Sequence, residues 1–182
     1  SLMEELISDI EPPRDQIFDD LTRELREGLA VPVLIGAAER GNGVTRVLKA
    51  LRHESPGIAG TRARLGVAED GPPLAHVVRS IHTAHGGKLS LARVLRGSFV
   101  ENAKVIGPSG IEDRIGSIAR LVGTMSSRQP TAEEGDTLAF GRLDHVPTGA
   151  TFADAKAGAP RAILPPLTPP HPVHALVVTI KD

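Results

Sequence analysis

Cysteine, tryptophan and tyrosine are absent from the 182-residue chain, and the four aromatic side chains are Phe18, Phe99, Phe140 and Phe152. The lack of cysteine excludes disulfides, thiolate metal sites and cysteine nucleophiles. The scarcity of rings argues against binding nucleic acid by stacking bases on aromatic side chains. A hydrophobic core must therefore be built mainly from valine, isoleucine, leucine and alanine.

Long apolar runs are also missing, since no stretch approaches the ~18 residues that a membrane-spanning helix needs. The composition, 40% hydrophobic and 24% charged, is that of an ordinary globular protein. We therefore expect a cytoplasmic protein with no membrane partner. The length corresponds to about one domain, or to one domain with pieces of its neighbours.

Neither sign of charge is in large excess, because 21 basic and 22 acidic residues give a net charge of −1. The charges are nevertheless distributed unevenly. Acids outnumber bases eleven to seven through Gly57, whereas fourteen bases face eleven acids from Ile58 onward. This mild basic excess permits contact with a polyanion without demanding it.

The first part of the chain predicts the order helix, strand, helix, after a short helical stretch over 2–10. Asp15 can cap a helix that ends at Gly28, and Val31–Ile35 is an apolar run typical of a strand covered on both faces. A second amphipathic helix follows over 44–51. The apolar positions at helical spacing in the two helices are Ile17, Phe18, Leu21, Leu25, Val44, Val47, Leu48 and Leu51. One buried strand between two helices is a piece of an α/β sheet, so we expect its partner strands to lie upstream of this chain.

Short strands separated by turns are predicted beyond a glycine-rich linker at 58–72. They cover 74–81, 88–96, 99–106, 114–122 and 137–141. This spacing predicts a small closed β-barrel over 73–160, whose narrow interior aliphatic side chains can fill. A stiff proline-rich connector follows, and His174–Ile180 predicts a strand that opens a further domain.

Several of these residues, in this order and at this spacing, resemble a known family. The strand Val31–Leu34, the turn Gly36-Ala37-Ala38 and the helix that starts at Gly43-Val44 resemble the end of the GTPase domain of bacterial elongation factor G. The rest of the chain resembles that factor's second domain. The matching landmarks are Leu74-Ala75, Val77-Val78, Gly87-Lys88-Leu89, Arg93-Val94, Gly97, Arg114-Ile115-Gly116, Arg120, Gly135-Asp136, Thr148-Gly149 and Pro172-Val173.

The resemblance implies a mainly β fold, namely a closed barrel of the translation-factor type preceded by the α/β end of a GTPase domain. It implies that 1–57 end the GTPase domain, 58–72 form a linker, 73–160 form the barrel, and 161–182 lead into a third domain. Elongation factor G is a GTPase that drives tRNA and mRNA through the ribosome. Its barrel lies against the GTPase domain and the small-subunit ribosomal RNA.

GTP chemistry is expected of the parent protein and not of this chain. The chain contains no Gly-x-x-x-x-Gly-Lys-[Ser/Thr] loop to hold phosphates, so we expect it neither to bind nor to hydrolyse GTP. Gly36, Ala37 and Ala38 stand where the family has a Gly-Ser-Ala motif beside the guanine, and they can equally form a plain tight turn. This loss and the divergent stretch 122–130 suggest an elongation-factor-G-like paralogue.

Basic residues on the barrel are candidates for contact with ribosomal RNA, and we expect Arg93, Arg96 and Lys104 to lie on the ribosomal face. The alternation along 88–96 places Ser90, Ala92 and Val94 on the inner face and Arg93 on the outer face. Uniformly scattered surface arginines that maintain solubility are the alternative.

Other constellations favour plain structural roles. The histidine pairs at 82–85 and 171–174 lack a third ligand, so we expect no metal. The carboxylates at 133–136 fit a solvated turn better than an acid–base site. The rival to a translation factor is a stand-alone barrel that holds a ligand such as flavin, which would need a polar pocket inside the barrel. DNA is not an expected partner.

Overall fold

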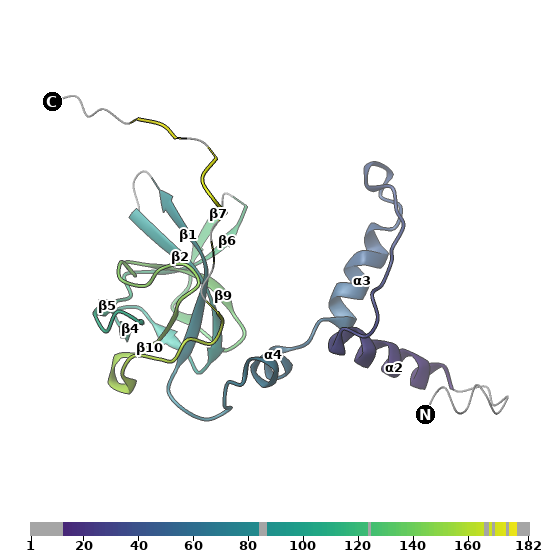
Figure 1. Cartoon of the computed structure of the whole chain (residues 1–182), viewed down its shortest axis with the longest axis horizontal. Helices are drawn as coiled ribbons and strands as arrows, with labels where there is room; N and C mark the ends of the chain where they lie inside the picture. Colours follow the sequence, from purple (N-terminus) through teal and green to yellow (C-terminus); the bar gives the residue numbers. More distant parts are fainter. Residues whose placement is uncertain are drawn as a thin grey trace. The chain divides into compact units, whose positions relative to one another are not determined.

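The computed structural model of the chain describes residues 13–83, 87–123, 125–165, 168, 170–173 and 175–177. Contacts between Cα atoms divide the chain into two units, 1–60 and 61–182, with helices in the first and mainly strands in the second (Figure 1). The predicted helix over 2–10 lies outside the described residues. So does most of the predicted strand 174–180, and its described residues 175–177 form no strand.

The first unit contains α2 (Arg14–Glu27) and α3 (Val44–Glu54), which contact each other. Helix α2 ends as predicted, since Gly28 adopts a φ of 75° and its N–H donates to the Leu25 carbonyl at 3.2 Å. Its start differs from the prediction. Pro13 occupies the N-cap position, and Asp15 lies in the first turn, where a carboxylate is favoured by the helix dipole.

The predicted strand Val31–Ile35 is wrong for this structure. Residues 31–36 form no strand, and Val31 and Ile35 are 84% and 93% exposed. A strand exists only where a neighbouring strand pairs with its backbone, and no described strand lies beside this segment. The apolar residues Phe18, Leu48 and Leu51 of the two helices are also exposed.

The first part of the predicted linker at 58–72 forms helix α4 (Ile58–Leu65), which was not predicted from the sequence. It ends at Gly66, whose φ of 65° stops the helix, and the Val67 N–H donates to the Arg62 carbonyl at 3.0 Å. No helix in the described part of the chain is long and apolar enough to cross a membrane.

The described residues of the second unit form ten strands and a 3₁₀ turn, η2 (Ala155–Ala157), after the end of α4. The strands are β1 (Leu74–Thr83), β2 (Gly87–Arg96), β3 (Phe99–Val100), β4 (Lys104–Ile106), β5 (Glu112–Arg114), β6 (Ile118–Val122), β7 (Met125–Arg128), β8 (Thr131–Ala132), β9 (Thr137–Gly141) and β10 (Thr151–Asp154). The prediction of a mainly β protein is therefore confirmed.

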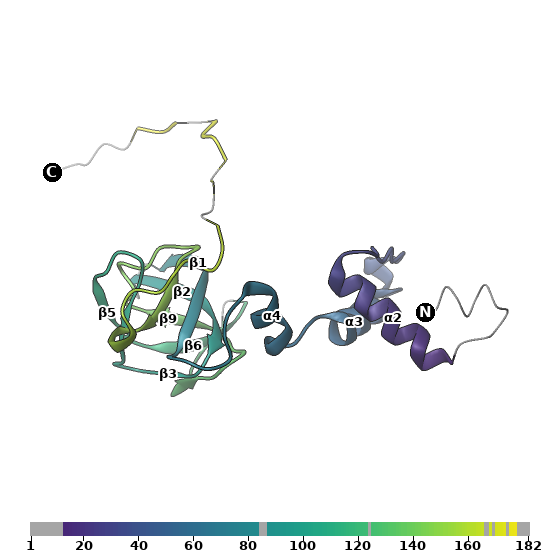
Figure 2. The same ribbon diagram turned by 60° about the horizontal axis from the view of Figure 1, so that its bottom comes forward.

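The large sheet has the antiparallel order β5-β4-β10-β1-β2-β9-β6-β7, and β3 pairs with β8. Its two sides meet because β5 runs directly into β6. In the link between them, the Ile115 N–H donates to the Ala103 carbonyl at 3.0 Å, and the Gly116 N–H donates to the Gly141 carbonyl at 2.9 Å. The chain thus bonds first to the β4 side and then to the β9 side, and the sheet wraps around a common interior (Figure 2).

Three phenylalanines from distant parts of the chain fill that interior. Phe99, Phe140 and Phe152 are all buried, with ring centroids 5.2 to 6.1 Å apart and interplanar angles of 54° to 85°. Such tilted and edge-to-face arrangements are the favoured geometry for aromatic pairs. Aliphatic side chains complete the core around the rings: Ala75, Val77, Ala92, Val94, Val105, Ile115, Ile118, Leu138, Leu143 and Val146.

Strand boundaries match the prediction best where alternation is regular. β1, β2 and β9 agree closely, and the inner positions Ser90, Ala92 and Val94 are all buried. The predicted strand 99–106 is divided by a turn at Asn102, whose φ is 64°, and the predicted strand 114–122 is interrupted between β5 and β6. Strands β7, β8 and β10 were not predicted.

Ser90 is the exception in the apolar interior, since its hydroxyl is buried and has no hydrogen-bond partner in the described structure. Burying a hydroxyl without a partner removes its hydrogen bonds to water, and no bond within the protein replaces them. We expect Ser90→Ala to raise the free energy of unfolding by about 1 kcal/mol, measured by chemical denaturation.

Ala92, the next inward residue on the same strand, supplies the control. Ala92→Ser adds a hydroxyl to the same interior and should lower the free energy of unfolding by about 1–3 kcal/mol. A loss of stability in Ser90→Ala would show that this hydroxyl has a partner in solution.

Candidate functional site

The predicted guanine motif lies in a closed loop that leads into α3. Ala37 donates its N–H to the Asn42 carbonyl at 3.0 Å, and its own carbonyl accepts the Asn42 N–H at 3.1 Å. The 3₁₀ turn η1 (Ala38–Arg40) fills the loop between them. The two ends approach so closely that a Cβ on Gly36 would lie 2.7 Å from the Asn42 carbonyl oxygen. Only glycine fits at Gly36, and Gly43 opposite it also has no room for a Cβ.

This geometry defines what the loop can offer to a ligand. Both backbone groups of Ala37 are used inside the loop, and no hydroxyl stands where the family has serine. Gly36, Ala37 and Ala38 are all exposed. The structure therefore shows a tight turn held by two glycines, and a role in nucleotide binding remains a hypothesis for the parent protein.

The three cations predicted to face ribosomal RNA lie in different environments. Arg93 on β2 is half-buried and donates to the Thr137 Oγ1 at 3.2 Å. Lys104 on β4 is exposed and pairs with Glu112 at 3.0 Å. Arg96 ends β2, and in the described residues its guanidinium donates to backbone carbonyls. Strands β10 and β1 separate β4 from β2 in the sheet, so the structure does not gather the three into one cluster.

Arg96 organises the segment that leads into the barrel, here called the entry loop (residues 66–73). Its Nε donates to the Pro72 carbonyl at 2.8 Å, and its Nη1 donates to the carbonyls of Ala68 at 3.0 Å and Asp70 at 2.8 Å. The guanidinium also covers Gly71, where a Cβ would lie 2.8 Å from its Cζ. A groove of about 480 Å³ opens beside this loop and has Arg96 in its wall.

A second arginine fastens the same segment. Arg62 on α4 is 6% exposed and forms an ion pair with Glu134 in the turn before β9. Its Nη2 also lies 3.6 Å from Glu69 of the entry loop. A buried arginine without a carboxylate partner is strongly destabilising, and here Glu134 and Glu69 supply the compensating charge. Neither role of Arg62 or Arg96 was predicted, because their partners are not visible as a sequence motif.

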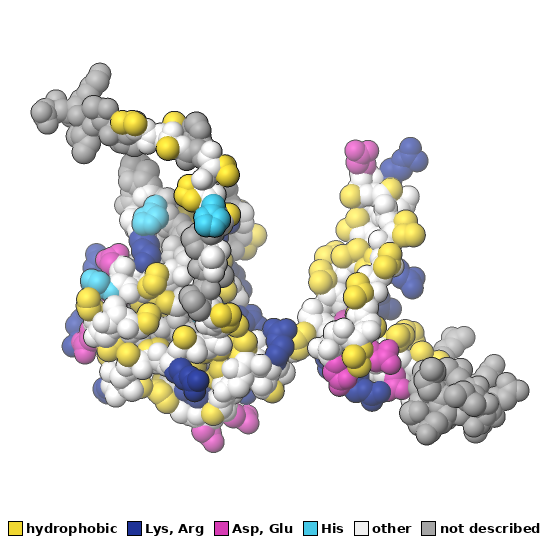
Figure 3. All heavy atoms as spheres, in the orientation of Figure 1, with side chains coloured by type: hydrophobic (Ala, Val, Ile, Leu, Met, Phe, Trp, Pro, Cys, Tyr) yellow, Lys and Arg dark blue, Asp and Glu magenta, His cyan; other side chains and the backbone are white. Residues whose placement is uncertain are grey.

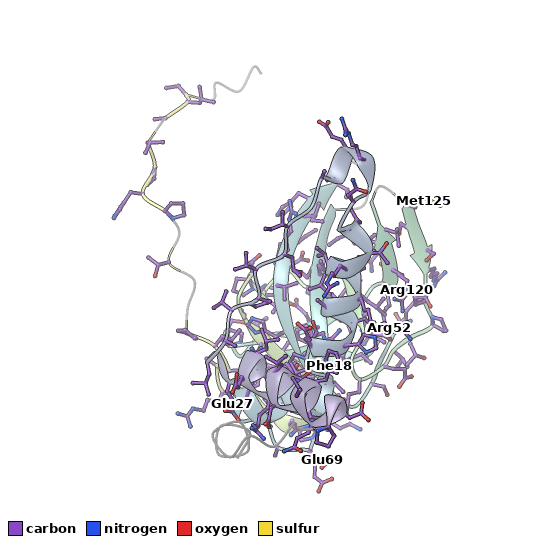
Figure 4. All side chains as sticks on the ribbon, turned by 90° about the vertical axis from the view of Figure 1, so that its right-hand side faces the viewer. Phe18, Glu27, Arg52, Glu69, Arg120 and Met125 are labelled. Atoms are coloured by element: carbon purple, nitrogen blue, oxygen red, sulfur yellow. The ribbon has the colours of Figure 1, made fainter. Side chains whose placement is uncertain are left out.

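Two further ion pairs brace the hairpin β6–β7, at whose tip Figure 4 shows Met125. Arg120 binds Asp136 at 3.1 Å, and the other Asp136 oxygen accepts the Glu133 N–H at 3.0 Å. Arg128 forms a two-pronged pair with Glu101. Hydrogen bonding from Arg128 lowers the pKa of Glu101, and the same bonds raise the pKa of Arg128.

The turn before β10 is held from two sides. Lys88 donates its Nζ to the Leu143 and Val146 carbonyls, each at 2.8 Å. Asp113 accepts both the backbone N–H of His145 at 2.9 Å and a contact from its ring Nδ1 at 2.8 Å. These contacts position backbone, and they form no constellation of nucleophile and base.

The predicted loop histidines are only partly covered by the structure. His82 and His171 are exposed, whereas His85 and His174 lie outside the described residues. Among the described residues, no three histidine or carboxylate side chains gather as metal ligands would. The carboxylates at 133–136 form the predicted turn, closed by an Asp136 N–H bond to the Glu133 carbonyl at 2.9 Å.

Among the histidines that the structure describes, His76 is the most buried. It is 8% exposed on β1, and its Nδ1 lies 3.2 Å from the Thr151 Oγ1 on β10. Burial disfavours the charged imidazolium and lowers the pKa of His76 below its ordinary value of 6.5. The pair links the neighbouring strands β1 and β10 on the face opposite the core residues Ala75, Val77 and Phe152.

Comparison with known proteins identifies the family. No protein-family model matches the chain. An elongation factor G-like protein of Synechocystis sp. is 36% identical to it over 179 residues, which are 97% of this chain and 25% of that protein. An elongation factor G-like protein of Mycobacterium tuberculosis is 25% identical over 207 residues, covering 98% of this chain and 29% of that protein. The chain belongs to the elongation factor G-like family.

The solved structures agree with this assignment at the level of fold. A crystal structure of a Thermus thermophilus protein superimposes with a TM-score of 0.65 at 23% identity, over 84% of this chain and 22% of that one. This elongation factor G-like chain spans about a quarter of the length of the curated relatives that it matches. The similarity therefore concerns one portion of those longer proteins.

Removing the Arg96 side chain should free the entry loop without unfolding the barrel. In Arg96→Ala, three carbonyls lose their shared donor, and we expect the ¹⁵N order parameters of residues 68–71 to fall from about 0.85 to below about 0.6. Arg93→Ala on the same strand removes a single bond to Thr137 and should leave these values unchanged. Equal order parameters in both variants would show that the loop is held without Arg96.

Burial of His76 predicts a loss of stability in acid. In the unfolded chain, His76 becomes protonated near its ordinary pKa of 6.5, whereas in the folded chain its protonation requires a lower pH. The free energy of unfolding should therefore fall as the pH drops through 6.5, by at most about 1.4 kcal/mol per pH unit from this group. Denaturation at pH 7.5 and 5.5 should show a smaller fall in His76→Asn.

The matched control is His82→Asn, an exposed position on the same strand. It should keep the pH dependence of the unchanged chain. If His76→Asn keeps it as well, the acid sensitivity comes from another group.

Proposed function

We propose that this chain is part of a ribosome-dependent GTPase that promotes movement of tRNA and mRNA through the ribosome. The observation that supports the proposal most strongly is similarity over 97% of the chain to an elongation factor G-like protein. The chain lacks a phosphate-binding loop, so GTP would be bound and hydrolysed by another part of the full-length protein. The role of this portion would then be to bind the ribosome and to couple that binding to the GTPase domain.

Within that protein, residues 1–57 would complete a GTP-binding domain, 73–160 would form the barrel, and 161–182 would lead to a third domain. The exposed apolar side chains of the first unit support this assignment. Phe18 is 66% exposed, and Val33 is 83% exposed in a segment with the composition of a buried strand. Side chains of this kind are stable where further elements of an α/β domain cover them.

The barrel interior supports docking over ligand storage. Phe99, Phe140 and Phe152 contact one another at the centre, where a flavin or another cofactor would have to lie. The groove beside the entry loop lies outside this core. The proposal of a stand-alone flavin-binding module is therefore the weaker one.

For the barrel, contact with small-subunit ribosomal RNA remains the proposal, through Arg93, Arg96 and Lys104. Arg93 and Lys104 each have one side-chain partner, so each keeps donors for a phosphate. Arg96 contributes less, because its Nε and Nη1 already serve the entry loop. Phosphate contacts of this kind position a protein on RNA without reading its sequence.

The proposed function is tested by GTP hydrolysis with purified ribosomes. The full-length protein should hydrolyse GTP, and ribosomes should accelerate it by tenfold or more in this assay, an effect on the order of 1.4 kcal/mol in the barrier. The 182-residue chain alone should neither bind nor hydrolyse GTP. Movement of mRNA by one codon on pre-translocation ribosomes then tests the translocation step.

Two results would contradict the proposal. One is a full-length GTPase whose rate is unaffected by ribosomes. The other is stoichiometric binding of a flavin by the 182-residue chain, which would favour the ligand-binding alternative.

A further inference from the structure

Several cations of the second unit are engaged within the molecule. Arg62, Lys104, Arg120 and Arg128 pair with carboxylates, and Lys88 and Arg96 donate to backbone carbonyls. Each such contact uses donors and neutralises charge that a polyanion would otherwise meet. Exposed barrel cations without a pairing carboxylate in the described residues include Arg79 on β1 and Arg114 on β5, but strands β4 and β10 separate these two in the sheet. A basic surface with several free cations side by side lies instead on a helix.

Helix α3 carries such a surface. Arg46, Lys49 and Arg52 are all exposed, and no carboxylate or carbonyl in the described part of the chain pairs with any of their side chains. The only acid on the helix is Glu54, at its C-terminal end. These residues are here called the α3 basic face; Arg52 is labelled in Figure 4.

The spacing of the three cations aligns them. They are three residues apart, so they lie on one side of the helix, and successive members are separated by a rise of about 4.5 Å along its axis. At 100° per residue, Arg46 and Lys49 lie opposite the apolar stripe, and Arg52 lies at the edge of the basic arc, about 40° from Leu48. The stripe consists of Val44, Val47, Leu48 and Leu51. His53 lies within the same basic arc and adds a further donor.

The apolar stripe indicates which side of α3 would be covered in a larger protein and which side would stay accessible. Figure 3 shows apolar side chains running along the unit that carries α3. Whatever covers this stripe, burial of the opposite face would remove three unpaired charges from water at large cost. The α3 basic face therefore stays in contact with solvent or with an anionic partner.

We propose that the α3 basic face binds the phosphate backbone of structured RNA, as a contact site separate from the barrel. This inference rests on the proposed function, in which the partner is ribosomal RNA. A line of long cations with no aromatic side chain on the same arc fits evenly spaced phosphates. It fits a protein partner less well, because protein interfaces are enriched in aromatic residues and depleted of lysine, and this arc has a lysine and no aromatic ring.

Binding of the 182-residue chain to a fluorescent RNA duplex of about 16 base pairs, followed over a series of salt concentrations, tests the proposal. We expect measurable binding at low salt. In the triple variant Arg46→Gln, Lys49→Gln and Arg52→Gln, the affinity should fall about tenfold or more, and the slope of log K against log salt should fall by about 2 to 3.

The control variant changes the net charge by the same amount on the barrel, with Arg120→Gln, Arg128→Gln and Lys156→Gln. Arg120 and Arg128 are paired with carboxylates, and Lys156 lies on η2. The fold-decrease in RNA affinity of this control should be less than a third of that of the α3 triple variant. Circular dichroism should show that both variants keep the secondary structure of the unchanged chain.

Several outcomes would overturn the inference. They are no RNA binding by the unchanged chain at low salt, an equal loss in both variants, or competition by polyglutamate as effective as by RNA. Ribosome-stimulated GTP hydrolysis by the full-length protein reports on the proposed function separately. If ribosomes stimulate GTP hydrolysis but the α3 triple variant binds RNA as well as the unchanged chain, only the further inference is contradicted.

Discussion

The contact of three phenylalanine rings is the constraint on which the barrel depends. Phe99 comes from β3, Phe140 from β9 and Phe152 from β10, so one cluster joins the early, middle and late parts of the second unit. The small sheet β3–β8 shares no strand with the large sheet, and Phe99 and Ala132 bring it into the common core. With so few rings in the sequence, the loss of one could not be replaced by a neighbouring aromatic side chain.

Arginines organise the exterior in a corresponding way. Arg62 and Arg96 fasten α4 and the entry loop to the barrel, one through carboxylates and the other through backbone carbonyls. A guanidinium suits both tasks because its donors are fixed in one plane. The residues between Thr61 and Leu74 are therefore part of the barrel unit, with contacts that the prediction of a linker at 58–72 did not include.

The periodicity of apolar residues predicted the long, regular strands correctly. It failed where a strand depends on hydrogen bonds to a neighbouring strand. β1, β2 and β9 follow from their alternation, and the end of α2 follows from Gly28, because these signals are local. Val31–Ile35 has the composition of a strand, but composition cannot supply the neighbouring strand. β8 has two residues, which is too few to show a period, and Gly60 inside α4 favoured a linker.

The candidate sites show the same division. The glycines of the 36–43 loop and the outward position of Arg93 could be predicted from spacing. The roles of Arg62 and Arg96 could not, since their acceptors include carbonyls and a carboxylate more than seventy residues away. The α3 basic face was not predicted from the sequence, although its three cations stand at helical spacing, because their contacts decide whether they are paired.

The aromatic composition also gives the protein a simple optical signature. Without tryptophan or tyrosine, its near-ultraviolet circular dichroism comes from phenylalanine alone, and three of the four rings lie in the fixed cluster. That signal disappears when side-chain packing is lost, even where the secondary structure persists. The weak phenylalanine bands therefore report on the barrel core without an added probe, and Phe18, exposed on α2, lies outside that reporter group.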